Sequence, residues 1–174
     1  MSANGIRATR VLAAAALGVT CLVAPAAAAA TGGYQQTDVR QQSDVERQIA
    51  HQLSANPGAK RISANEVAWR DGTVDVVVTV PEPGAEPLAA NCPSTKVCVY
   101  EGANFGGLRQ DFYNCGTAAI TVNGVSSWHN NQTTNTTSWL LTVLGGNLQS
   151  TQAVSKVNYV GDGSNDLAKF IHVC

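Results

Sequence analysis

The chain has 174 residues, with 11 Lys and Arg against 12 Asp and Glu and a formal net charge of −1. Charged residues make up 13% of it, against a usual share of about 25%. Without a surplus of cationic side chains to neutralise phosphates, a basic nucleic-acid-binding protein is excluded. The chain is neither strongly acidic nor of low complexity. Abundant Gly, Thr, Asn and Val, with little Leu, Glu and Lys, exclude an all-helical bundle.

Residues 1–30 have the order of features typical of a secretory signal peptide. Two arginines give a positive start, residues 11–23 form an apolar stretch too short to span a bilayer, and residues 28–30 offer an Ala-x-Ala cleavage site. We therefore expect residues 1–30 to be removed and the mature protein to be extracellular. Cys21 is then discarded, since the residues before it lack the pattern of a lipoprotein signal.

The remaining cysteines all lie in the second half of the chain, at Cys92, Cys98, Cys115 and Cys174. An even number of cysteines in a secreted chain predicts two disulfides, for which three connectivities are possible. A zinc site is the weaker interpretation, because the spacing contains no Cys-x-x-Cys pair and no histidine lies at ligand spacing from the cysteines.

A proline-rich stretch at 81–91 divides the mature chain. We expect it to be an extended linker between a small α+β segment at 31–80 and an all-β domain at 92–174. The second segment is expected to fold and act without the first. The first segment is marginal for independent folding without disulfides. It is interpreted as an accessory subdomain that docks on the rest of the chain or, alternatively, as a pro-segment or secretion aid.

A helix and a hairpin are predicted within 31–80. Residues 43–46 (Ser-Asp-Val-Glu) form a capping box, so the helix is predicted to begin there. Val45 and the apolar residues four and eight positions later lie on one helix face, and Pro-Gly at 57–58 ends the helix. The hairpin turns at 70–72 and continues into a strand of alternating valines.

Residues 92–174 alternate short apolar stretches with turn residues, as sandwiches and small barrels do. The predicted strands are 96–100, 108–113, 125–129, 138–144, 154–159 and 168–173. One spacing of two apolar residues and a glycine occurs twice, in Tyr100, Phe105 and Gly107 and again in Trp139, Leu144 and Gly146. Each set predicts a folded hairpin corner, in which the apolar pair packs together and the glycine adopts a conformation that a Cβ would forbid.

Residues 100–107 (Tyr-Glu-Gly-Ala-Asn-Phe-Gly-Gly) resemble the corner signature of βγ-crystallin-type domains. With the flanking cysteines and Val-Ser-Ser at 125–127, they resemble the secreted actinobacterial peptidase inhibitors of crystallin-like fold, the streptomycete metalloproteinase inhibitor type. The resemblance covers about residues 90–174. It implies a mainly β fold, a βγ-crystallin-like double Greek-key sandwich preceded here by the helix-plus-hairpin segment, and inhibition of extracellular proteases, metalloproteases among them.

We therefore predict a secreted protease inhibitor that acts through a rigid exposed loop on a disulfide-bonded β-scaffold. We expect Cys92 to pair with Cys98, and Cys115 with Cys174. The polar loop at 129–137 is a candidate contact surface, because loops carry function more often than cores do. The expected partner is an extracellular protease, with no nucleic acid and no membrane, and we expect a monomer.

The alternative function is a calcium-binding, glycan-binding or toxin-like crystallin module without inhibitory activity. An enzyme is not expected, because the chain has no nucleophile-elbow motif and its 3 histidines are scattered. No cofactor is expected. Calcium is the one metal that the pattern of the crystallin-type loops suggests.

Both crystallin-type calcium loops are degenerate in this chain. One loop keeps Asn123 and Ser126, and the other keeps Asp166 but adds the positive charge of Lys169. Since Ca²⁺ takes six to eight oxygen ligands, two full sites are not expected. A composite site from Ser126, Asp166 and a backbone carbonyl near Glu101 is one hypothesis. The other is that Asn123 and Asp166 serve only as turn residues.

Overall fold

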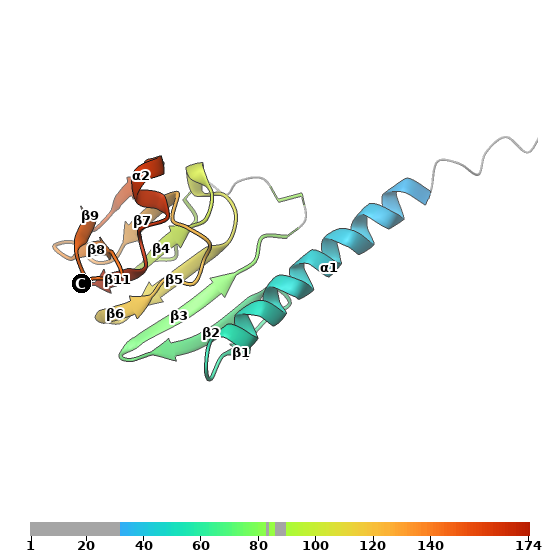
Figure 1. The fold of residues 1–174 in the computed structure, drawn as a ribbon, viewed down its shortest axis with the longest axis horizontal. Helices are drawn as coiled ribbons and strands as arrows, with labels where there is room; N and C mark the ends of the chain where they lie inside the picture. The colour runs from blue at the N-terminus through green and yellow to red at the C-terminus, as the bar shows by residue number, and fades with distance from the viewer. Residues whose placement is uncertain (1–31, 83, 86–89) are drawn as a thin grey trace, which may run out of the picture.

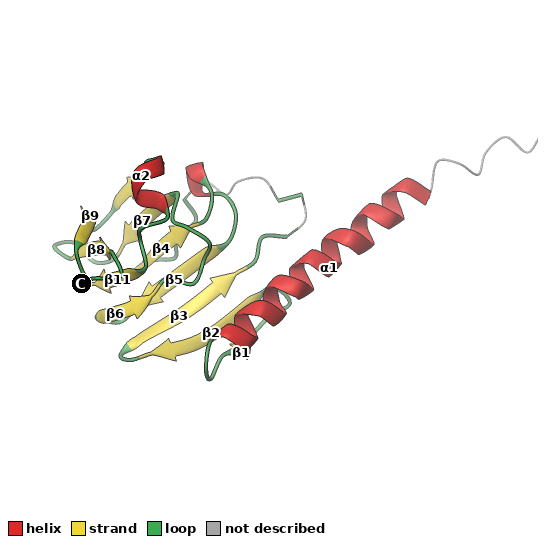
Figure 2. Ribbon diagram, in the orientation of Figure 1, coloured by secondary structure: helices red, strands yellow, loops and turns green. Residues whose placement is uncertain are grey.

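The computed structural model describes residues 32–82, 84–85 and 90–174. The predicted signal peptide lies outside the described residues, and so does part of the predicted linker. Strands dominate the described part, and one long helix stands at its start (Figure 2). No helix in these ranges is long and apolar enough to cross a membrane.

Helix α1 (Gly32–Ala55) begins well before the predicted capping box. The predicted start at Ser43 is wrong, because Ser43 lies inside the helix and its hydroxyl donates to the carbonyl oxygen three residues earlier, at 2.6 Å. Such a bond to the preceding turn is an alternative to capping. The predicted apolar face is present in Val45 and Ile49, which are buried, whereas Leu53 is 37% exposed.

A short strand and a hairpin follow, as β1 (Lys60–Arg61), β2 (Glu66–Asp71) and β3 (Val74–Thr79). The turn contains Gly72 at a φ of +60°, which a side chain would disfavour. Val74, Val76 and Val78 are fully buried, as the alternation predicts, and Val77 between the last two is buried as well. Helix α1 lies beside β1 and β2 at one end and projects away from the sheets at the other (Figure 1).

The rest of the chain completes two antiparallel sheets. Its strands are β4 (Lys96–Tyr100), β5 (Arg109–Tyr113), β6 (Gly116–Ala119), β7 (Ser127–Asn131), β8 (Thr137–Leu141), β9 (Asn147–Gln152), β10 (Ser155–Val157) and β11 (Phe170–Val173). The 3-10 turn η1 (Ala103–Phe105) and the short helix α2 (Asp162–Asn165) lie between strands. The first sheet has the order β1-β2-β3-β5-β4-β7-β10, and the second has β6-β11-β8-β9.

The third strand of each consecutive set of four crosses to the opposite sheet. Strands β4, β5 and β7 lie in the first sheet while β6 lies in the second. Strands β8, β9 and β11 lie in the second sheet while β10 lies in the first. Each sheet therefore contains one strand of the other set, so the two sets are interlocked and share one core.

The N-terminal hairpin is continuous with the first sheet. Strand β3 pairs with β5 over five residue pairs. Val74 and Val76 of β3 lie in one hydrophobic cluster with Val97, Phe112 and Trp128. Side chains from the first segment therefore take part in the core of the second, across the division expected at 81–91.

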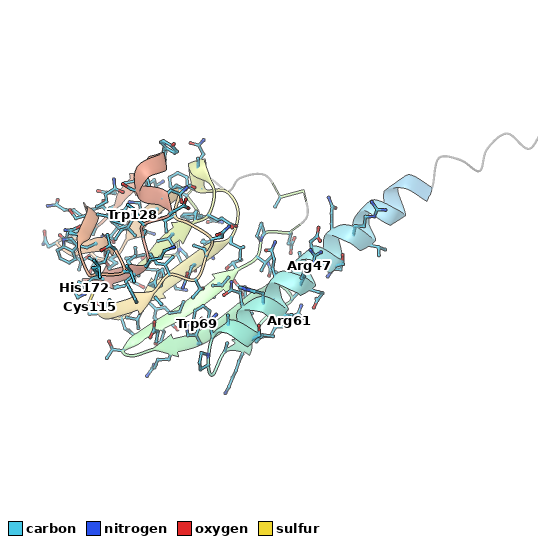
Figure 3. The ribbon with its side chains drawn as sticks, in the orientation of Figure 1. Arg47, Arg61, Trp69, Cys115, Trp128 and His172 are labelled. Atoms are coloured by element: carbon cyan, nitrogen blue, oxygen red, sulfur yellow. A yellow bond between two sulfur atoms is a disulfide. The ribbon has the colours of Figure 1, made fainter. Side chains whose placement is uncertain are left out.

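Helix α1 packs on the part of the first sheet that the hairpin adds. Val45 and Ile49 form a second cluster with Val67 and Val80. Trp69, which lies on the hairpin beside α1, packs against both clusters (Figure 3). The first sheet has seven strands and the second four, so the second sheet is too narrow to cover the whole face of the first. Helix α1 covers the apolar surface that remains.

One disulfide is local and the other joins distant parts of the chain. Cys92 pairs with Cys98 and Cys115 with Cys174, the pairing that the sequence analysis expects, with Cα–Cα distances of 5.6 and 5.2 Å. The second bridge spans a sequence separation of 59 residues and ties the C-terminus to the start of β6. By chain entropy alone, a loop of this length is worth about 4 kcal/mol of stability.

The first corner has the arrangement that the sequence analysis expects. The Tyr100 and Phe105 rings meet edge to face, with centroids 5.3 Å apart. Gly107 has a φ of +75°, and a Cβ there would lie 3.2 Å from the backbone nitrogen of Gly102. The Ser127 hydroxyl holds the corner closed, because it donates to the Gly102 carbonyl at 2.7 Å and accepts the Phe105 N–H at 2.9 Å.

The second predicted corner is wrong. Leu144 is 93% exposed and does not pack on Trp139, whose ring lies against His172 with centroids 5.4 Å apart. The left-handed glycine is Gly145, at a φ of +77°, and not Gly146. Strand β8 ends three residues before Leu144, so the chain makes a tight turn here instead of a folded-over corner.

The corner makes a matched prediction for two glycines. Gly107→Val should lower the free energy of unfolding by about 3 kcal/mol, because valine is strained at this φ and its Cβ meets backbone. Gly163→Val should change it by less than about 0.5 kcal/mol, because a Cβ there meets nothing within 4 Å. Urea denaturation of both variants measures the difference, and equal losses would contradict the corner assignment.

The shared core makes a second matched prediction. Val76→Ala in the hairpin and Val99→Ala in β4 should each cost about 2 kcal/mol of stability, because both side chains are fully buried in the same cluster. Calorimetric unfolding of the two variants checks this. If only Val99→Ala lowered the melting temperature, the hairpin would be a loosely docked appendage.

Candidate functional site

The turn between β8 and β9 presents the two most exposed large apolar side chains in the described part of the chain. Val143 is 70% exposed and Leu144 is 93% exposed. We call residues 142–146 the apolar tip. Large apolar side chains exposed together on a protrusion mark an interaction surface more often than scattered ones do.

Three hydrogen bonds fix the backbone of the apolar tip. The Thr142 N–H donates to the Gly146 carbonyl at 2.9 Å, and the Gly145 N–H donates to the Thr142 carbonyl at 2.9 Å. The Gly146 N–H also donates to the Thr142 hydroxyl oxygen at 3.0 Å. The two apolar side chains therefore stand on a backbone that loses little conformational freedom when it binds.

The predicted contact loop at 129–137 is buried over its first part. His129 and Gln132 are 4% and 8% exposed, and the Asn130 amide donates to the Thr151 carbonyl at 3.0 Å. Gln132 also accepts the Ser138 hydroxyl at 2.8 Å. Only the turn at 133–135 is exposed. Most of the loop at 129–137 therefore packs inside the protein, so it offers a smaller contact surface than the apolar tip.

The two predicted calcium loops do come together. The Asn165 amide donates to the Ser126 hydroxyl oxygen at 2.8 Å, and the Val125 N–H donates to the Asn165 carbonyl at 3.1 Å. Gly124 lies against both Asn165 and Asp166, so closely that a Cβ would clash. Asn165 is thus the residue that joins the loops.

Several oxygen atoms of these loops already have partners within the protein. The Ser126 oxygen already accepts from an amide, and the Ser127 hydroxyl and the Gly102 carbonyl are bonded to each other. Asn123 and Asp166 are exposed. No group of three or more His, Cys, Asp and Glu in the described residues could hold a metal ion. The Asn165 Oδ1, which lies beside Gly124, is buried without a hydrogen-bond partner within the described residues, so the calcium hypothesis stays a prediction.

The histidines lie in three different settings. His51 is exposed on α1, and His129 is buried in β7. His172 is half-buried in β11, where its Nδ1 lies 2.9 Å from the Thr117 hydroxyl (Figure 3). Their different settings give no support to a catalytic constellation of the kind that acid–base chemistry needs.

The apolar tip is the site that the sequence analysis missed. The spacing of Trp139, Leu144 and Gly146 suggests a buried pair, but spacing does not show where a strand ends. The sequence does contain a signal for a turn, because two glycines follow the apolar pair directly at 145–146. A consecutive Val-Leu pair before Gly-Gly also breaks the alternation that a half-buried strand needs.

The site is therefore a fixed apolar turn on a disulfide-bonded, mainly β scaffold. Residues 85–151 match the model of peptidase inhibitor family I36. The match covers less than half of the chain, and it includes the first corner and the apolar tip. No curated protein and no solved structure shows significant similarity to the chain. The match supports an inhibitor of peptidases and suggests a non-enzymatic protein.

His129 makes the stability depend on pH. Burial, followed by the charge of Lys156, lowers the pKa of His129 below its ordinary value of 6.5. The folded state then binds fewer protons than the unfolded state, so stability is lost as the pH falls below 6.5. The free energy of unfolding of His129→Gln should depend less on pH than that of the unmodified protein between pH 7 and about pH 5. Identical profiles for the two proteins would contradict this.

Proposed function

We propose that the protein is a secreted inhibitor of extracellular proteases and that it binds its target through the apolar tip. The match of residues 85–151 to an inhibitor family supports the activity. The exposure of Leu144, at 93%, is the observation that supports the place of contact. The two disulfides suit an oxidising, extracellular setting, and the predicted signal peptide would bring the chain there.

The scaffold is proposed to be a βγ-crystallin-like double Greek key of the actinobacterial inhibitor type. The exchange of β6 and β10 between two interlocked sets of four strands supports it. So does the edge-to-face pair of Tyr100 and Phe105 at the first corner. The hairpin and α1 are then an addition at the edge of β5, and their role as an accessory subdomain or a pro-segment stays a prediction.

The apolar tip can block a protease by filling the pocket that selects the substrate side chain. Leu144 and Val143 would enter a pocket that accepts branched aliphatic side chains, and burying them supplies binding energy. Because the turn is already hydrogen-bonded, little entropy is lost on binding. The same bonds keep the backbone from adopting the extended form that cleavage needs. A thermolysin-like metalloprotease is the proposed target class, with serine proteases as the comparison.

Substitution of the tip tests this proposal. Leu144→Asp should raise the inhibition constant by about 30-fold or more, because a buried apolar anchor is worth about 2 kcal/mol and a charge is poorly accommodated in its pocket. The measurement is a titration of thermolysin-like and serine proteases with the unmodified protein and the variant.

Val154→Asp is the matched control. Val154 is also apolar and 61% exposed, and it lies in the turn between β9 and β10 at the opposite end of β9. Its substitution should leave inhibition unchanged. A loss of inhibition with Val154→Asp and none with Leu144→Asp would move the contact to the other end of the sheet. Absence of inhibition across the panel would reject the function.

A further inference from the structure

The outer face of the second sheet has a tryptophan on one of its inner strands. In β8, both neighbours of Trp139 are fully buried, so its own side chain points to the opposite face of the sheet. The same alternation in β11 places His172 on this outer face. Figure 3 shows His172 at the end of the molecule away from α1. The outer face is therefore not the surface that α1 covers.

Four residues form a row across the outer face, one from each strand. His172 of β11 pairs with Thr117 of β6 on one side and with Trp139 of β8 on the other. Trp139 in turn pairs with Ser150 of β9. Neighbouring strands lie about 4.8 Å apart, so the row is about 14 Å long. None of the four side chains is buried, and the row therefore offers a line of contact for an extended molecule.

Packing within the protein does not account for the aromatic residues of this face. Strand β8 places Ser138 in the core and Trp139 outside, although a sheet with one solvated face normally turns its apolar residues inward. Phe170 and Leu141 pair with each other on the outer face and are not buried either. Trp139, Phe170 and Leu141 belong to none of the hydrophobic clusters of the described residues. Apolar side chains grouped in this way indicate a binding surface.

Polar groups beside the tryptophan are accessible to a ligand. The indole N–H of Trp139 and the hydroxyl of Ser150 have no hydrogen-bond partner in the described part of the chain, and neither group is buried. The His172 ring is held against Trp139, with centroids 5.4 Å apart, and its Nδ1 lies 2.9 Å from the Thr117 hydroxyl. The row thus combines a held aromatic pair with hydrogen-bonding groups at its side.

The composition of the second sheet favours an uncharged ligand. Its four strands contain no Lys, Arg, Asp or Glu, and the nearest such residue in the sequence is Lys169, just before β11. A polyanion such as a nucleic acid would find no row of cations here. Protein interfaces are enriched in arginine and depleted in serine, so this face has the wrong composition for a protein partner. Hydroxyl, amide and aromatic groups suit a neutral sugar.

We propose that the outer face of the second sheet binds a neutral β-1,4-linked polysaccharide of the cellulose or chitin kind. In such a chain the hydroxyls lie at the edge of each ring, and the C–H bonds form flat apolar faces. One face would stack on Trp139, because the negative face of an aromatic ring attracts these hydrogens. The hydroxyls at the edge would bond to the Ser150 hydroxyl and the indole N–H. This binding does not depend on protease inhibition.

Calorimetric titration of the protein with cellohexaose, hexa-N-acetylchitohexaose and maltohexaose tests the proposal. At least one of the two β-linked sugars should bind, and which of them binds identifies the polysaccharide. Maltohexaose should bind at least tenfold more weakly, because its α-linked chain curls and cannot lie flat on the row. Absence of binding by both β-linked sugars, or equal affinity for maltohexaose, would overturn the proposal.

Substitutions in the row locate the site. Trp139→Ala should weaken binding by about tenfold or more, and the variant should stay folded because Trp139 lies outside the core clusters. Ser150→Arg, at an exposed position, should have a similar effect, because the guanidinium stacks on the Trp139 ring and covers it. Melting temperatures check that both variants are folded. Undiminished binding by either folded variant would overturn the proposal.

Tyr159→Ala is the matched control, because Tyr159 is an aromatic residue that is 53% exposed and lies outside the second sheet. Its substitution should leave the affinity for the sugar unchanged, and an equal loss with Tyr159→Ala would contradict the assignment to this face. Trp139→Ala should also leave protease inhibition unchanged. If it instead reduced inhibition and no sugar bound, the outer face would belong to the protease contact, and the polysaccharide proposal would be wrong.

Discussion

The pairing of β3 with β5 is the contact on which the rest of the structure depends. It adds the hairpin to the first sheet over five residue pairs. Val74 and Val76 thereby enter the core shared by both sheets. The widened sheet then exposes apolar surface around Val67 and Val80, and α1 covers it with Val45.

Strand exchange explains why the apolar tip can be exposed without weakening the fold. β6 and β10 each belong to the sheet opposite to that of their neighbours in sequence. The two strands therefore join the sheets around the shared core. The Cys115–Cys174 bridge then fixes β6 and the C-terminus together. β8 is held between β11 and β9, while β9 lies at the edge of its sheet. The β8–β9 turn therefore projects from a held strand and need not contribute to the core.

Local patterns predict the hairpin and six of the eight strands after residue 92, among them β4 with its observed bounds, and they miss β6 and β9. The valines of β3 alternate, so the hairpin was predictable from the sequence. β6 is Gly-Thr-Ala-Ala and β9 is largely polar, so neither has the β-branched alternation that identifies a strand. The capping box at Ser43 misled because the same residues also fit a helix interior. The corner predicted at Leu144 is wrong because a repeated spacing of apolar residues does not show whether each copy is buried in the core.

The first corner shows why residue identity matters beyond the spacing. Phe105 and Gly107 both have positive φ, and a strained residue such as Phe105 costs of order 1–3 kcal/mol unless its surroundings hold it. Ser127 supplies that hold through its bonds to both sides of the turn. A phenylalanine at position 100 could provide the same ring without burying a hydroxyl that costs about 1–3 kcal/mol when unpaired.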